Sequence, residues 1–138
     1  MRIEMKRLNN AFQMEAKAEN GKTVLFDGST KIGGHDEGVS PMQSLLMAMG
    51  ACSAIDIVLI LKKQKQELID LHINIDGERE QDKEPSLWKS IHAHFLLKGQ
   101  IEKGKAQRAV ELSMEKYCSV AATLRAAGAA ITYEVTVE

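Results

Sequence analysis

The sequence predicts an α+β protein whose strands and helices follow the order βββ-α-ββ-αα-β. Alternation of apolar and polar residues, typical of strands, fills the first third of the chain and returns after residue 70. One long apolar run separates these two regions, and two shorter stretches with helical spacing precede a last alternating segment. The 138 residues are expected to form a single domain, 1–138, because the chain has no repeat, low-complexity run or linker.

The first third of the chain is expected to form an antiparallel meander of three strands. Residues 2–7 alternate weakly and residues 12–19 alternate clearly between apolar and polar side chains. Asn20-Gly21 is a strong hairpin signal, since both residues accept the backbone conformation of a tight turn. The third strand is predicted at residues 23–26.

A long helix is predicted to begin at Ser40-Pro41, with serine as its N-cap and proline at the first helical position. It continues through the apolar run 45–61 to a basic end. This run is short for a membrane span, and Asp56 near its centre would be costly in lipid, so no membrane association is expected. Because the helix is apolar almost all round, it should be surrounded by protein, with a second copy of the chain as one candidate.

The second half of the chain is predicted to contain two strands, two helices and a last strand. Tyr117-Cys118 interrupts the helical pattern, and Ser119 is the predicted N-cap of the second helix, which Gly128 ends. The expected ranges are 71–76 and 90–97 for the strands, 102–116 and 120–127 for the helices, and 131–137 for the last strand.

The composition limits the classes of partner. Eighteen basic and nineteen acidic residues leave no electrostatic basis for binding nucleic acid or an anionic membrane. The N-terminus interleaves charged and apolar residues where a signal peptide needs an apolar run. The chain is therefore expected to be cytoplasmic, where thiols stay reduced unless they take part in chemistry.

The two cysteines, Cys52 and Cys118, are the main candidates for chemistry. Cys52 lies inside the long apolar helix and fits a core residue; Asp56, one turn further on, would disfavour a thiolate, so a reactive Cys52 needs a cation such as arginine. Cys118 precedes a predicted helix start, where free backbone N–H groups favour a thiolate, although a cysteine without a role fits equally well. If the two sulfurs meet in space, one can be oxidised by a peroxide and the other can resolve the sulfenic acid.

Three histidines, His72, His92 and His94, fall on the same face of two neighbouring predicted strands, near Asp76. This pattern fits either a zinc site or the solvent-facing side of an antiparallel sheet. No further ligand follows metal-site spacing, so no metal is expected. The glycine-rich segment 33–38 lacks the ending of a phosphate-binding loop, and no cofactor is expected.

The segments SPMQSLL (40–46) and GACSAID (50–56), followed far downstream by EKYCSV (115–120), resemble the OsmC/Ohr family of osmotically induced and organic hydroperoxide resistance proteins. The resemblance covers essentially the whole chain and is nearest to a branch of short bacterial OsmC-like proteins. It implies an intertwined homodimer with antiparallel sheets wrapped around central helices. It also implies that Cys52 is the peroxidatic thiol and Cys118 the resolving thiol, that organic hydroperoxides are held in an apolar pocket, and that an external dithiol, such as a lipoyl group on a partner protein, is the reductant.

The sequence departs from the hydroperoxide-resistance branch directly after Pro41. There a glutamate follows the proline and holds an activating arginine, whereas this chain has Met42 followed by Gln43. The expected function is a thiol-dependent peroxidase; the alternatives are a protein of the same fold that binds a small apolar ligand at the dimer interface, or a redox sensor. The residues expected to contribute to binding are Met42, Gln43, Met49 and Asp56, and the candidate activating cations are Arg2, Arg7, Arg79 and Arg125.

Overall fold

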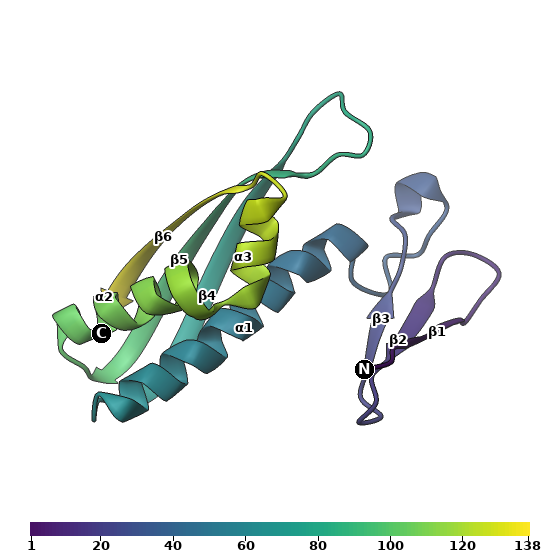
Figure 1. Ribbon diagram of the computed structural model, residues 1–138. Coiled ribbons are helices and arrows are strands. Elements are labelled where there is room, and N and C mark those ends of the chain that lie inside the picture. Colours follow the sequence, from purple (N-terminus) through teal and green to yellow (C-terminus); the bar gives the residue numbers. More distant parts are fainter. The chain divides into compact units, whose positions relative to one another are not determined.

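The computed structural model describes residues 1–138, and the chain forms two compact units, residues 1–45 and 46–138. Each unit contains its own three-stranded sheet. The order of strands and helices along the chain is the predicted βββ-α-ββ-αα-β, so the α+β prediction is confirmed (Figure 1).

The first unit is the predicted antiparallel meander. The third strand has the predicted bounds, but the first begins later than predicted and the second is shorter than predicted at both ends. The side chain of Asn9 accepts hydrogen bonds from the backbone N–H groups of Ala11 (2.9 Å) and Gln13 (3.2 Å), which turns residues 9–13 into a loop. The strands are β1 (Glu4–Arg7), β2 (Met14–Lys17) and β3 (Thr23–Phe26), followed by a short 3-10 helix, η1 (Thr30–Ile32).

A buried carboxylate organises the loop after β3. Asp27, 5% exposed, accepts hydrogen bonds from the backbone N–H groups of Gly28 (2.7 Å), Glu37 (3.1 Å) and His35 (3.3 Å). Burial by itself raises the pKa of Asp27, but these three N–H donors outweigh it and hold the pKa below its ordinary value of 3.8. The loop has room only for glycine at position 34, because a Cβ there would lie 1.9 Å from the carbonyl oxygen of Gly28.

The second unit is a three-stranded sheet with helices on one face (Figure 1). β4 and β5 form an antiparallel hairpin, and β6 pairs with β5 in parallel, a pairing that the sequence pattern did not predict. The elements are α1 (Pro41–Lys63), of which the part from Leu46 belongs to this unit, β4 (Glu67–Arg79), β5 (Trp88–Gln100), α2 (Lys103–Leu112), the π-helical turn η2 (Ser113–Tyr117), α3 (Ser119–Ala126) and β6 (Ala130–Val137).

The core of the second unit lies between β5 and the helices. Alternate residues of β5, from Ile91 to Leu97, are at most 1% exposed, and Met49, Ile57 and Leu61 of α1 are fully buried. Burial of an isoleucine, leucine, phenylalanine or methionine side chain contributes about 1.5–3 kcal/mol. This core fixes the helices that carry the two cysteines against one sheet.

The outer side of α1 has little cover within the chain, so its predicted cover by something else, such as a second copy of the chain, stays a prediction. Its buried residues repeat every fourth position, which makes one narrow stripe along the helix. By length and composition alone, α1 is long and apolar enough to cross a membrane. Of its most apolar stretch of 18 residues, 28% is buried. One such helix is weak evidence for a membrane protein. Its large exposed apolar side chains in the second unit are Met47, Ile55, Val58 and Leu59.

Candidate functional site

The structure brings the two cysteines together, although they are 66 positions apart in the sequence. Their side chains approach to 3.2 Å, and both are free thiols. Cys52 lies in the middle of α1 and is half-buried, whereas Cys118 lies between η2 and α3 and is 2% exposed. The two thiols are therefore close enough for exchange chemistry, and Cys52 is the more accessible of them.

A π-helical turn places Cys118 in this position. The backbone N–H of Cys118 donates to the carbonyl oxygen of Ser113, five residues earlier, at 2.7 Å. Cys118 then leaves the helical conformation and caps α3, since its sulfur accepts the N–H of Ala121 at 3.3 Å. The prediction that Ser119 is the cap is wrong by one residue: Ser119 is the first residue of α3.

Burial keeps the Cys118 thiol protonated at neutral pH. Burial is the largest cause that raises the pKa of Cys118, and a hydrogen bond with Cys52 and the charge of Cys52 add to it, so that the pKa rises from 9.0 to about 11. The N–H groups of Ala121 and Val120 lower it, as the sequence suggested, but they do not outweigh burial. The prediction that Cys118 favours a thiolate is therefore wrong.

A buried serine links the two elements that carry the cysteines. Ser113 is fully buried, and its hydroxyl donates to Oδ2 of Asp56 in α1 at 2.9 Å. Asp56 lies one turn after Cys52, and Ser113 begins the π turn that ends before Cys118. This hydrogen bond thus fastens η2 to α1 beside the cysteine pair, a role for Ser113 that the sequence did not indicate.

The four predicted binding residues lie in different places. Met49 is fully buried, and its carbonyl oxygen lies 3.9 Å from Sγ of Cys118. Asp56 is half-buried and lines a pocket. Met42 and Gln43 lie in the first turn of α1, in the first unit. Only Met49 and Asp56 belong to the same unit as the cysteines.

The candidate arginines bind other groups. Arg7 donates to the carbonyl oxygens of Ala11 (2.9 Å) and Asn10 (2.6 Å) and so closes the loop after β1. The Arg2 backbone N–H donates to Glu19 at 2.7 Å. The guanidinium of Arg79 donates to the Ser86 carbonyl oxygen (2.8 Å) and lies over the Trp88 ring (5.5 Å), and that of Arg125 donates to the Met114 carbonyl oxygen (3.2 Å) and lies 3.8 Å from Glu115. None of these contacts is with a cysteine.

Glu115 also anchors the π turn, in this case to α3 and β6. It forms the ion pair with Arg125 of α3 and a hydrogen bond with Tyr133 of β6. Burial, and then the charge and hydrogen bond of Glu115, raise the pKa of Tyr133. The turn that carries Cys118 is thus bound to α1, α3 and β6.

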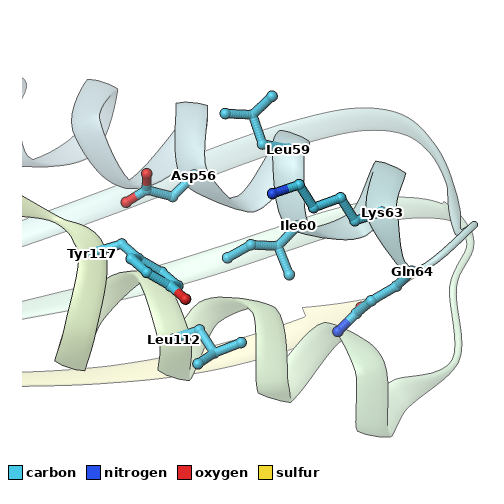
Figure 2. A pocket seen from close by; sticks show the side chains of 7 residues that line it. All are labelled: Asp56, Leu59, Ile60, Lys63, Gln64, Leu112 and Tyr117. Carbon is cyan, nitrogen blue, oxygen red and sulfur yellow. The ribbon is translucent and has the colours of Figure 1, made fainter.

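A pocket of about 530 Å³ opens between α1 and the α2–η2 segment (Figure 2). Apolar side chains form its walls, the Asp56 carboxylate lies at one end and the Gln64 amide at the other, and the Lys63 side chain reaches back over Ile60 between them. Its carboxylate end adjoins the cysteines, because Asp56 follows Cys52 by one turn and Tyr117 directly precedes Cys118. The lining residues are Asp56, Leu59, Ile60, Lys63, Gln64, Leu112 and Tyr117.

The first unit has a separate, more apolar pocket of about 610 Å³. Most of its lining comes from the strands of the meander and the loop after β3. Side chains on this face of the small sheet have little cover within the unit: Ile3, Met5 and Ile32 are each more than half exposed. This face is a candidate contact surface.

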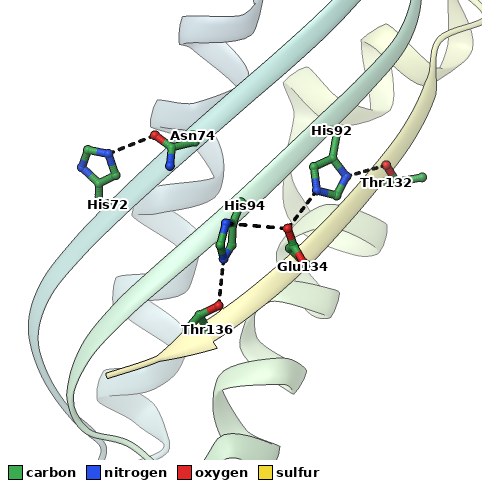
Figure 3. A network of polar contacts seen from close by, with 7 residues as sticks. All are labelled: His72, Asn74, His92, His94, Thr132, Glu134 and Thr136. Atoms are coloured by element: carbon green, nitrogen blue, oxygen red, sulfur yellow. Dashed lines mark hydrogen bonds and ion pairs between the residues drawn. The ribbon is translucent and has the colours of Figure 1, made fainter.

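The histidines lie on the open face of the second sheet, opposite the helices (Figure 3). One Glu134 carboxylate oxygen lies 3.3 Å from Nε2 of His92 and 3.7 Å from Nδ1 of His94. His72 bonds Asn74 at 3.0 Å on the neighbouring strand. No group of three or more His, Cys, Asp or Glu side chains is arranged to hold a metal ion. Of the two interpretations of this pattern, the structure shows the solvent-facing side of a sheet.

Comparison with known proteins agrees with this architecture. Residues 34–134 match the family model described as OsmC-like protein. Protein YhfA of Escherichia coli strain K12 is 41% identical over 121 residues, which cover 86% of this chain and 87% of YhfA.

Solved structures extend the likeness to the whole fold. A hypothetical protein from Aquifex aeolicus VF5 is 32% identical, with 99% of this chain and 96% of that one covered and a TM-score of 0.81. An organic hydroperoxide resistance protein OsmC from Legionella pneumophila shares the fold at 16% identity, with 99% and 97% covered and a TM-score of 0.74. With its cysteine pair, its order of elements and these relatives, the chain belongs to the OsmC-like protein family.

Proposed function

We propose that this protein is a thiol-dependent peroxidase that reduces organic hydroperoxides through Cys52 and Cys118. The observation that carries the proposal is the 3.2 Å approach of two free thiols of unequal burial. The half-buried Cys52 can meet a peroxide, whereas Cys118 is enclosed and stays protonated. Family membership supports this assignment, since solved structures of the same fold are named as organic hydroperoxide resistance proteins.

The reaction has two steps within the protein. The Cys52 thiolate attacks the distal oxygen of ROOH, the O–O bond breaks, and Cys52 becomes a sulfenic acid while RO⁻ takes up a proton and leaves as ROH. Cys118, deprotonated as it attacks, then displaces hydroxide from the Cys52 sulfur, which forms the disulfide and releases water.

An external dithiol completes the cycle. Its two thiols reduce the disulfide by exchange and become a disulfide themselves, so both cysteines return to the thiol form. A lipoyl group on a partner protein has the required chemistry. A cytoplasmic location is proposed with this cycle, because reducing thiols are available there.

Turnover of cumene hydroperoxide with dihydrolipoic acid as reductant tests the mechanism. Cys52→Ser is expected to abolish turnover, whereas Cys118→Ser should consume one equivalent of peroxide and stop at the sulfenic acid. Ser119→Ala is the matched control, since it changes an exposed neighbour of Cys118 and should retain activity. Comparable multiple turnover by the wild type and Cys52→Ser would refute the proposal.

We further propose that the two units form one OsmC-like domain and that this domain assembles as a homodimer. The uncovered apolar side chains of α1 and the apolar face of the small sheet support a dimer, because such surfaces are costly in water. Sedimentation should give twice the chain mass, and Ile55→Glu, on the exposed side of α1, should weaken the assembly. A monomer at micromolar concentration would contradict this.

A second candidate is an apolar-ligand binding protein or redox sensor on the same fold. The engagement of Arg7, Arg79 and Arg125 with other groups favours it, as do Met42 and Gln43 in place of an acidic residue. This candidate predicts that the wild type forms the Cys52–Cys118 disulfide with peroxide but does not turn over with any dithiol.

A further inference from the structure

Ser113 connects α1 to the backbone of Cys118 through two hydrogen bonds. Its hydroxyl donates to Oδ2 of Asp56 at 2.9 Å, and its carbonyl oxygen accepts the N–H of Cys118 at 2.7 Å. Asp56 lies one turn after Cys52 in α1, and residues at this spacing are neighbours on a helix surface. The path through Ser113 therefore begins beside one sulfur and ends at the residue that carries the other.

Cys118 itself makes weaker polar contacts with α1. Apart from its contact with the Cys52 thiol, its sulfur meets α1 through the carbonyl oxygen of Met49, which is 3.9 Å away, and a thiol is a weak donor. The shorter hydrogen bond of the sulfur, from the N–H of Ala121 at 3.3 Å, is made within α3. The bond between Ser113 and Asp56 is thus the strongest polar link between α1 and the segment that carries Cys118.

The polar anchor of the π turn to α3 is more exposed than the anchor to α1. Glu115 lies 3.8 Å from the Arg125 guanidinium, and the side chains of this pair are 53% and 35% exposed. Exposed ion pairs contribute little to stability, whereas a hydrogen bond from a buried hydroxyl to a carboxylate is among the stronger polar contacts. Ser113 is fully buried, so its bond to Asp56 should stabilise the position of the turn more than the ion pair does.

We propose that Ser113 and Asp56 are positioning residues for the second step of the reaction, because their hydrogen bond keeps the Cys118 sulfur within reach of the Cys52 sulfenic acid. This inference rests on the proposed peroxidase function. In that step the S–S bond forms as the S–O bond of the sulfenic acid breaks, and the hydroxide leaves with the Cys118 proton as water. The attacking sulfur has to be aligned with the S–O bond, and a misplacement of about 1 Å can slow such a step about a hundredfold.

The rate of the second step also decides what else happens to the sulfenic acid. A second hydroperoxide molecule can oxidise it to the sulfinic acid and be reduced to the alcohol, a reaction in which Cys118 takes no part. The bond between Ser113 and Asp56 therefore sets the ratio of disulfide to sulfinic acid. Loss of this bond should raise the share of Cys52 that is irreversibly oxidised.

A single turnover with one equivalent of cumene hydroperoxide separates the two steps. Loss of the hydroperoxide measures the first step, and mass spectrometry of the acid-quenched chain measures sulfenic acid, disulfide and sulfinic acid. In Ser113→Ala, disulfide formation should slow by about tenfold to a hundredfold, while the first step keeps its rate. With excess hydroperoxide, this variant should accumulate the Cys52 sulfinic acid, and the wild type should not.

Variants of Asp56 separate the loss of the hydrogen bond from the loss of the charge. Asp56→Asn should form the disulfide at nearly the wild-type rate, since an amide oxygen accepts the same hydrogen bond. Asp56→Ala should be slowed as much as Ser113→Ala, and the double variant no further, because each change removes the same bond. Glu115→Gln is the matched control and should keep the wild-type rates, since it removes the ion pair of the same turn and leaves the contact with α1.

Equal rates of disulfide formation in the wild type, Ser113→Ala and Asp56→Ala would overturn the inference, as would equal losses in Asp56→Asn and Asp56→Ala. Equilibration of the reduced protein with lipoic acid and dihydrolipoic acid needs no hydroperoxide, so it separates this failure from that of the proposed function. A disulfide equilibrium constant that falls about tenfold or more in Ser113→Ala, in a protein that reduces no hydroperoxide, would refute the peroxidase and retain the positioning role. An unchanged constant would refute the positioning role whatever the activity.

Discussion

Replacing Cys52 with alanine should change the titration of Cys118 in a defined direction. Burial, with a smaller contribution from Cys52, raises the pKa of Cys118 from 9.0 to about 11. Two pKa units make the reactive thiolate of Cys118 about a hundredfold rarer near neutral pH than that of an unperturbed thiol. Cys52→Ala removes the contribution of the neighbouring sulfur but not burial, so the pKa should fall and remain above 9.0.

The pKa of Cys118 in the wild type and in Cys52→Ala is measured from the rate of alkylation by iodoacetamide. The Cys118 peptide is followed by mass spectrometry from about pH 7 to about 10.5. In the wild type, the rate should still rise severalfold per pH unit at the top of this range, whereas in Cys52→Ala it should begin to level off earlier. Burial slows alkylation at every pH, so the shape of the profile, not the absolute rate, reports the pKa. A wild-type profile that levels off below about pH 9 would refute the reasoning.

The same shift links Cys118 to stability. Because the folded-state pKa is raised, the folded protein favours the protonated thiol. This contribution to the free energy of unfolding is complete below the ordinary pKa of 9.0 and is lost as the pH rises toward about 11. The Cys118→Ser variant, which has no such thiol, should lose less stability over this range.

Three further predictions concern the scaffold, all measured as urea midpoints. The pKa of Asp27 is held below 3.8, so the ionised carboxylate adds to the free energy of unfolding above that pH, and this addition is lost as the pH falls below it. Asp27→Asn should therefore make the stability less sensitive to acid, and an unchanged acid response would contradict this. Gly34→Ala should be strongly destabilising because its Cβ meets a backbone oxygen, whereas Gly104→Ala, in α2 with open space around it, should stabilise by about 0.5–1 kcal/mol. Ser113→Ala should cost about 1–3 kcal/mol, since Asp56 loses its donor; a cost near zero would show that water replaces it.

Local patterns predicted most of the fold. Alternation located every strand of the second sheet, and Ser40-Pro41 located the start of α1. The parallel pairing of β6 with β5 was not predictable from alternation, which gives the faces of a strand but not its neighbour or direction. Cover of the outer side of α1 by a second chain stays a prediction, since an apolar helix indicates that it is covered but not by which chain.

The candidate site was predictable only in part. The sequence identified both cysteines and the break at Tyr117-Cys118, but it assigned the cap to Ser119, because sulfur is not among the common capping groups. It also overestimated the effect of the free N–H groups, since the burial that outweighs them depends on tertiary packing. The pocket between α1 and the α2–η2 segment has a sequence signal in the spacing of Asp56 and Lys63, but its facing wall comes from a segment some fifty residues further along the chain.

The π-helical turn before Cys118 makes the distance between the sulfurs sensitive to chain length. A π turn holds more residues than an α turn, so deletion of one residue between Ser113 and Tyr117 would allow a regular α-helix to form there. Such a deletion would rotate everything after it by about 100° around the helix axis. Sequence drift can therefore alter an exposed side chain of this turn, such as Lys116, and keep the thiol pair, but it cannot change the number of residues without separating the two sulfurs.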